Sequence, residues 1–190
     1  MVSLAGMPYA VLMPVFADRI LGGGAQGLGL LMSCAGGGAL IGALTLAARR
    51  SPRGLTAWVP WGAFGFGFGL LAFSLSRNFW LSALLLAPTG FAMMVQMASS
   101  NTLLQLLVPD ALRGRVMSLY SMMFMGMAPL GALLAGALAG LVGAPATVAG
   151  GGALCMLAAL WFRRRLPAIA EAARALGHHL GPPTDQRNPP

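Results

Sequence analysis

The feature that most constrains this chain is the stretch of residues 116–162, which contains no charged side chain. Three more uncharged stretches precede it, over residues 20–48, 54–76 and 78–109. A hydrocarbon layer of about 30 Å requires about 20 apolar helical residues for each crossing. Charged residues make up 8% of the chain, whereas soluble domains carry about 25%. The sequence therefore predicts an all-α membrane protein.

Six transmembrane helices are predicted from these stretches and from the glycine and proline signals between them. They cover residues 2–16, 28–48, 55–75, 79–107, 116–139 and 146–162. The first is interpreted as a retained span and not a signal peptide, because it lacks a basic start and Pro8 and Pro14 interrupt it. The last two are separated at residues 140–145, where Gly and Pro predict a turn. The six helices form one domain over residues 1–165.

The arginines predict the orientation of the chain, which has no lysine. If the amino terminus is cytoplasmic, the outer loops hold only Arg19 and Arg77. The inner segments then hold Arg49, Arg50, Arg53, Arg113, Arg115, Arg163, Arg164, Arg165, Arg174 and Arg187. This distribution follows the positive-inside rule and places both termini in the cytoplasm, in a multi-pass protein of the plasma (inner) membrane. Four tryptophans fall at the predicted membrane boundaries, where indole rings are favoured: Trp58, Trp61, Trp80 and Trp161.

The carboxy-terminal segment is different in character. Residues 166–180 carry apolar side chains at helical spacing, which fits a short amphipathic helix on the inner leaflet or, alternatively, a frayed tail. Residues 181–190 are rich in proline and are expected to be disordered.

Polar side chains distinguish the helix predicted at residues 79–107 from its neighbours. The helices at 55–75 and 146–162 have almost no polar interior residues and are expected to face lipid. An unpartnered buried amide costs about 2–7 kcal/mol, so the polar groups of residues 79–107 must meet another helix, water or a ligand. The candidate substrate pathway consists of Tyr9, Gln96, Ser99, Ser100, Asn101, Gln105 and Tyr120. Hydrogen bonding between helices alone is the alternative reading.

Other patterns are interpreted as packing. Cys34 and Cys155 lie in separate apolar runs and are read as small core residues, not as a disulfide or metal pair. Glycine pairs four residues apart, at Gly38, Gly65 and Gly136, are expected to allow close helix packing. The net charge of +8 comes from short arginine clusters without a basic face, so no nucleic-acid partner is expected. No metal site, cofactor or enzymatic activity is expected.

The segment between the fourth and fifth predicted helices is the most specific motif. It reads Pro-Asp-Ala-Leu-Arg-Gly-Arg over residues 109–115. Asp110 can cap a starting turn and reach Arg113, Gly114 permits close backbone approach, and Arg115 can reach lipid phosphate. We interpret these four residues as a cytoplasmic charge cluster that controls gating.

With residues 7–9, 14–18 and 126–131, this motif resembles the carboxy-terminal half of a major facilitator superfamily transporter. Within that family the chain is most similar to the branch of the enterobactin exporter and drug-efflux proteins. The resemblance implies two six-helix halves, each made of inverted three-helix repeats, with substrate at the midplane. It also implies a missing amino-terminal half, so the chain would be a gene fragment, a late start or a genuine half-size protein. The basic loop at Arg49, Arg50 and Arg53 departs from the family pattern because it lacks an acid.

The expected function is therefore that of half a secondary transporter. It would export a small organic molecule such as a drug or siderophore by alternating access, as a proton-coupled antiporter. Its expected partners are the bilayer, the small-molecule substrate, and either the missing amino-terminal half or a second copy. The alternative is a non-transporting membrane protein, either an accessory subunit or an inactive fragment.

Overall fold

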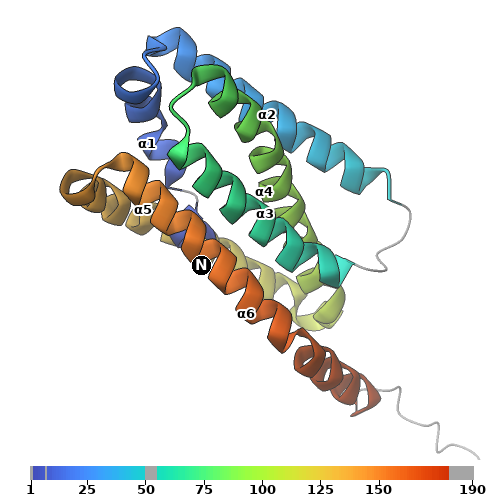
Figure 1. The fold of residues 1–190 in the computed structure, drawn as a ribbon. Coiled ribbons are helices and arrows are strands. Elements are labelled where there is room, and N and C mark those ends of the chain that lie inside the picture. The colour runs from blue at the N-terminus through green and yellow to red at the C-terminus, as the bar shows by residue number, and fades with distance from the viewer. Residues whose placement is uncertain (1, 7, 50–54, 180–190) are drawn as a thin grey trace, which may run out of the picture.

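The computed structural model describes residues 2–6, 8–49 and 55–179, and this part of the chain contains helices and no strands. Figure 1 shows long helices packed side by side at an angle to one another. In chain order the elements are η1 Val2–Gly6, α1 Tyr9–Val15, η2 Phe16–Ile20, α2 Gly24–Ala47, α3 Leu55–Leu75, α4 Phe79–Leu107, α5 Asp110–Val142 and α6 Ala144–His179. Arg50, Arg53 and the predicted disordered tail lie outside the described residues.

The helices α3 and α4 begin and end where the sequence predicts. Asn78 stops the preceding turn and caps α4, because its Oδ1 accepts hydrogen bonds from the backbone N–H groups of Trp80 at 3.0 Å and Leu81 at 3.2 Å. Pro60 lies in the second turn of α3 and Pro88 in the third turn of α4. Both helices continue through these prolines, as lipid-embedded helices often do.

The first predicted helix is broken into three short elements. Pro8 precedes α1 and Pro14 lies inside it, and the π-helical segments η1 and η2 flank it. A proline removes a backbone donor and clashes with the preceding turn, so π-helical geometry around the two prolines has a physical cause. Within the described residues, five helices are long and apolar enough to cross a membrane, namely α2 to α6. The sixth span therefore stays a prediction.

The outer bounds of three helices differ from the prediction. The helix α2 begins at Gly24 instead of residue 28, and α5 begins at Asp110 instead of residue 116. The helix α6 has 36 residues and ends at His179 instead of residue 162. It therefore includes residues 166–179 of the predicted amphipathic segment and is about 54 Å long, and its last turns extend beyond the bundle (Figure 1). The turn between α5 and α6 is confirmed, at Gly143 with φ 88°.

Several of the contacts between helices are made at glycine residues. An added Cβ on Gly38 or Gly90 would overlap the backbone of the facing helix, so α2 and α4 touch backbone to backbone at their crossing. Across the α3–α4 contact, Gly69 instead packs against the side chain of Thr89. On its other side α3 packs against α6. The pairs at Gly38 and Gly65 thus pack as predicted, whereas Gly136 and its partner Gly140 have no neighbour within 4 Å in the described chain.

The hydrophobic core lies between α3 and the first segment, which consists of η1, α1 and η2. Phe16 and Phe73 are fully buried, with ring centres 4.7 Å apart, and Tyr9 contacts the edge of Phe66 at 6.0 Å. Cys155 of α6 closes the same core, as expected of a small apolar residue. Because α3 is held between α4 and α6, it is the most buried of the five candidate spans. The prediction that α3 faces lipid was therefore wrong for the two sides of α3 that contact α4 and α6.

The inverted repeats expected from the family resemblance would relate η1, α1, η2, α2 and α3 to α4, α5 and α6. The second helix of each triplet packs on the first element of the other, α2 on α4 and α5 on η1. The third helices pack on each other at Gly67 and Gly152. A Cβ on either glycine would lie 2.5 or 2.6 Å from the carbonyl oxygen of the other. An inverted repeat would place a close crossing of its two third helices here.

Candidate functional site

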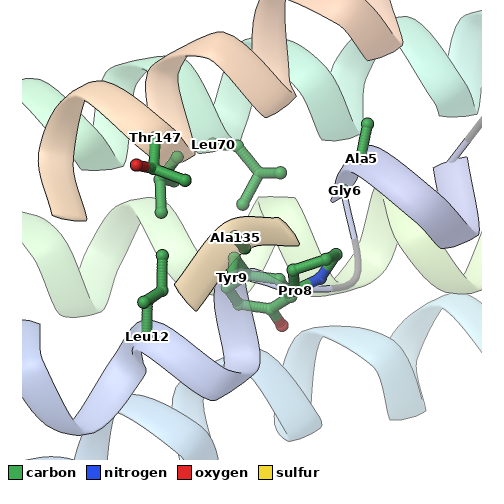
Figure 2. A pocket seen from close by; sticks show the side chains of 9 residues that line it. Ala5, Gly6, Pro8, Tyr9, Leu12, Leu70, Ala135 and Thr147 are labelled. Carbon is green, nitrogen blue, oxygen red and sulfur yellow. The ribbon is translucent and has the colours of Figure 1, made fainter. Parts of the chain in front are cut away.

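Tyr9, the first candidate pathway residue, lies in the core. It lines a cavity of about 10 Å³ together with Leu12, Leu70, Ala135 and other residues of the first segment and of α6. Figure 2 shows these side chains converging from several helices on one small space. A cavity needs about 10–15 Å³ to hold one water molecule. The space at Tyr9 is therefore too small for an organic substrate in this conformation.

Gln96, Ser99 and Ser100 lie on the side of α4 that adjoins α3. The backbone of Gln96 packs on Gly62, where an added Cβ would meet Gln96 atoms at 2.9 Å. The Nε2 of Gln96 donates a hydrogen bond of 3.2 Å to Ser100 Oγ. Ser99 is fully buried, and its hydroxyl has no partner among the described residues. The Gln96 amide is thus hydrogen-bonded within α4 itself and not to another helix, whereas Ser99 has no partner among the described residues.

Asn101, Thr102 and Gln105 lie about three turns beyond the crossing of α2 and α4. All three are partly exposed, and their side chains make no hydrogen bond within the described part of the chain. An amide facing hydrocarbon without a partner is costly. This end of α4 therefore requires water, a ligand or another protein segment beside it.

The helix α5 is the least buried of the candidate spans. Ser3 fixes it to η1 by donating a 2.7 Å hydrogen bond to the carbonyl oxygen of Phe124, and the stacked ring of Tyr120 lies 6.1 Å from that of Phe124. Tyr120 is partly exposed. Most large apolar side chains of α5 are exposed, including Met122, Met123, Met125, Leu130, Leu133, Leu134 and Leu141. Little of this helix is covered by the rest of the chain.

The predicted gating cluster occupies the start of α5. Pro109 holds the N-cap position and offers no side-chain hydrogen bond, and Asp110 is the first residue of α5, so the capping role of Asp110 stays a prediction. Arg113, Gly114 and Arg115 are exposed in the first turns. An added Cβ on Gly114 would have no neighbour within 4 Å, so the predicted close approach is not made within the described chain.

The sequence interpretation missed the pairing of arginines with tryptophans. Three guanidinium groups lie over indole rings: Arg49 over Trp58 at 3.9 Å, Arg163 over Trp61 at 5.1 Å, and Arg165 over Trp161 at 5.8 Å. Both residue types were read as separate boundary signals. Their common position at one end of the bundle was the available clue, because arginine at such a boundary favours an aromatic face.

Comparison with known proteins agrees with this architecture. A family model described as "Transmembrane secretion effector" (MFS_3) matches residues 2–187. Neither the curated proteins nor the solved structures include a match to this chain. The family match covers nearly the whole chain, and the apolar helices are those of a multi-pass membrane protein. The chain therefore belongs to the transmembrane secretion effector family of major facilitator transporters.

Proposed function

We propose that this chain is the carboxy-terminal six-helix half of an efflux transporter of the enterobactin-exporter and drug-efflux branch. The whole transporter exports a small organic molecule by alternating access. The second wall of its pathway comes from an amino-terminal six-helix half or from a second copy of this chain. The rival reading is a non-transporting accessory subunit or an inactive fragment.

The observation that carries this proposal is the polar end of α4. Asn101 and Gln105 carry amides that no described residue satisfies, on a helix whose opposite sides are occupied by α2 and α3. The poorly covered α5 adds an apolar surface to the same half. A second six-helix unit would cover α5 and enclose a polar space beside Asn101.

The triplet arrangement supports the same proposal. The contacts of α2 on α4 and of α5 on η1 correspond to each other, as in the inverted repeats that build each half of a major facilitator. The first elements of the two triplets hold Tyr9 and Gln96, and in such transporters these elements adjoin the pathway. The residues of the proposed pathway are Gln96, Ser99, Ser100, Asn101 and Gln105 of α4, with Tyr120 of α5 and with Tyr9, which is buried in this conformation.

Proton coupling in this proposal depends on the other half. The chain has four acidic residues, and none lies in the middle of a candidate span. Asp18 is in η2 and Asp110 is the first residue of α5. The carboxylate that carries the proton would therefore come from the partner. The proposed location is the inner membrane with both termini in the cytoplasm, where the arginine-rich ends attract anionic lipid.

Cysteine cross-linking tests the proposal. In a background with Cys34→Ala and Cys155→Ala, cysteines are placed at Leu133 of α5 and at Leu157 of α6. These side chains are 72% and 63% exposed, so their accessibility is matched. With the chain expressed alone in membranes, we expect Leu133→Cys to form a disulfide-linked dimer and Leu157→Cys to remain monomeric.

Co-expression with a six-helix amino-terminal half of the same family completes the test. It should replace the dimer by a cross-link to that half and restore export of a fluorescent dye. A chain that stays monomeric at both positions and gives no export with any partner half would support the accessory or inactive reading. Equal cross-linking at both positions would indicate nonspecific aggregation and would contradict the proposed interface.

A further inference from the structure

A groove between α3 and α4 opens at the arginine-rich end of the bundle. It is lined by Trp58, Trp61, Gly62, Phe91, Ala92 and Val95, and its volume is about 310 Å³. The lining is apolar apart from the indole nitrogens. Trp61 is 59% exposed, so the groove is accessible from outside the chain.

Two guanidinium groups flank this groove from different helices. Arg49 follows α2 and covers Trp58, and Arg163 belongs to α6 and covers Trp61. Since α2 packs on α4 and α6 packs on α3, the cations reach the groove from both of its sides. A guanidinium stacked on a ring keeps its N–H donors at the edge of its plane, where they can bind phosphate oxygens.

The two helices that line the groove carry no carboxylate. The sequence has no acidic residue between Asp18 and Asp110, so the segments that form the groove carry none. Neither Arg49 nor Arg163 forms an ion pair with a described residue. The groove thus combines an apolar floor with two positive charges at its mouth, at the level where tryptophans mark the membrane boundary.

We propose that this groove binds one anionic phospholipid of the arginine-rich leaflet. Arg49 and Arg163 hold its phosphate, and one acyl chain lies along Gly62 between Trp61 and Phe91. Basic pockets between transmembrane helices are suited to anionic headgroups. A soluble phosphate would leave the apolar floor uncovered, so the acyl chain is part of the recognition. The site is independent of the proposed transport function.

Brominated lipids test the site because bromine quenches nearby tryptophan fluorescence. The full chain carrying Trp80→Phe and Trp161→Phe reports only from the two groove tryptophans. It is reconstituted in phosphatidylcholine nanodiscs with increasing fractions of brominated phosphatidylglycerol or brominated phosphatidylcholine. We expect half-maximal quenching at an about tenfold lower fraction of the anionic lipid, since each arginine near the surface adds attraction.

Two matched double variants separate the groove from the general positive charge of this end. Arg49→Gln with Arg163→Gln should remove the preference for the anionic lipid. The control variant, Arg164→Gln with Arg165→Gln, removes the same charge from the same end of the bundle. It should retain the preference for the anionic lipid. The Arg163 side chain is exposed, and the single variant Arg163→Gln should lower the preference for the anionic lipid about threefold. This variant replaces the first double variant in the test if that double variant does not insert into the membrane.

Three outcomes would overturn the site. One is the absence of any preference for the anionic lipid in the parent chain. Another is an equal loss of the preference for the anionic lipid in the two double variants, which would indicate only a general attraction of the lipid to the positively charged surface. The last is displacement of the lipid by millimolar inorganic phosphate, which would show that the headgroup alone is recognised.

Discussion

The glycine triplet Gly150, Gly151 and Gly152 of α6 provides an internally controlled test of the fold. An added Cβ on Gly150 meets nothing within 4 Å, whereas one on Gly151 would overlap the carbonyl of Ala5. One on Gly152 would lie 2.6 Å from the carbonyl oxygen of Gly67. Alanine substitutions at these three consecutive positions therefore differ only in their surroundings. Gly150→Ala is the control without a neighbour, Gly151→Ala tests the contact with η1, and Gly152→Ala tests the contact with α3.

The expected magnitude for Gly152→Ala follows from this contact. Ordinary van der Waals contact begins at 3.4 Å, so α3 and α6 must separate by about 0.8 Å. Overpacking of this kind costs about 1–3 kcal/mol, and alanine returns up to about 1 kcal/mol of helix propensity. With the full propensity gain, the net loss is at most about 2 kcal/mol, which corresponds to a fall in melting midpoint of up to about 6 °C. Gly150→Ala has only the propensity gain and should raise the midpoint by up to about 3 °C.

Thiol labelling provides the assay. Cys155 is 0% exposed and lies one turn from Gly152, so a thiol-reactive fluorescent dye labels it only when α6 separates from the core. The background carries Cys34→Ala, and the chain is heated in detergent micelles with the dye present. A midpoint for Gly152→Ala equal to or above that of Gly150→Ala would show that α3 and α6 do not cross at Gly67.

Three further outcomes are expected. Reporter fusions after Arg77 and Gly143 should both be outside the cytoplasm, and a cytoplasmic signal at either site would contradict the six-span topology. Arg113→Ala in a complete transporter should lower dye export severalfold with unchanged membrane insertion by immunoblot; unchanged export would reduce this arginine to a topology signal. Asn101→Leu should raise the melting midpoint of the isolated chain by about 2 °C, because it removes an unsatisfied amide. A lower midpoint would mean that Asn101 has a partner within the chain.

The ends of the helices show what hydropathy can and cannot predict. Both ends of α3 and α4 were correctly predicted, because Asn78 and the residues around it stop a helix and also mark the membrane boundary. The start of α5 and the end of α6 were wrong, because charged residues such as Arg115 and Arg163 mark the boundary without ending the helix. Hydrogen bonding continues into water, so an apolar run gives the span and not the whole helix.

The partners of each helix could be predicted only in part. The glycines at Gly38 and Gly65 indicated close contacts, but a similar pair at Gly136 has no neighbour. An apolar residue is equally suitable beside lipid or beside another helix, so the burial of α3 could not be derived from its composition. The polar cluster of α4 was visible in the sequence, whereas the bond between Gln96 and Ser100 depended on side-chain geometry.

The contact between Gly67 and Gly152 also bears on how the bundle responds to temperature. It joins two helices by backbone contact, of the kind that Cα–H···O interactions stabilise at helix crossings. When such a crossing opens inside hydrocarbon, the newly exposed surface meets acyl chains and not water. The heat-capacity change that accompanies hydration of apolar groups is therefore small for this step. The affinity of α3 for α6 should consequently vary little on cooling, unlike the core of a soluble protein, which weakens as the hydrophobic effect declines.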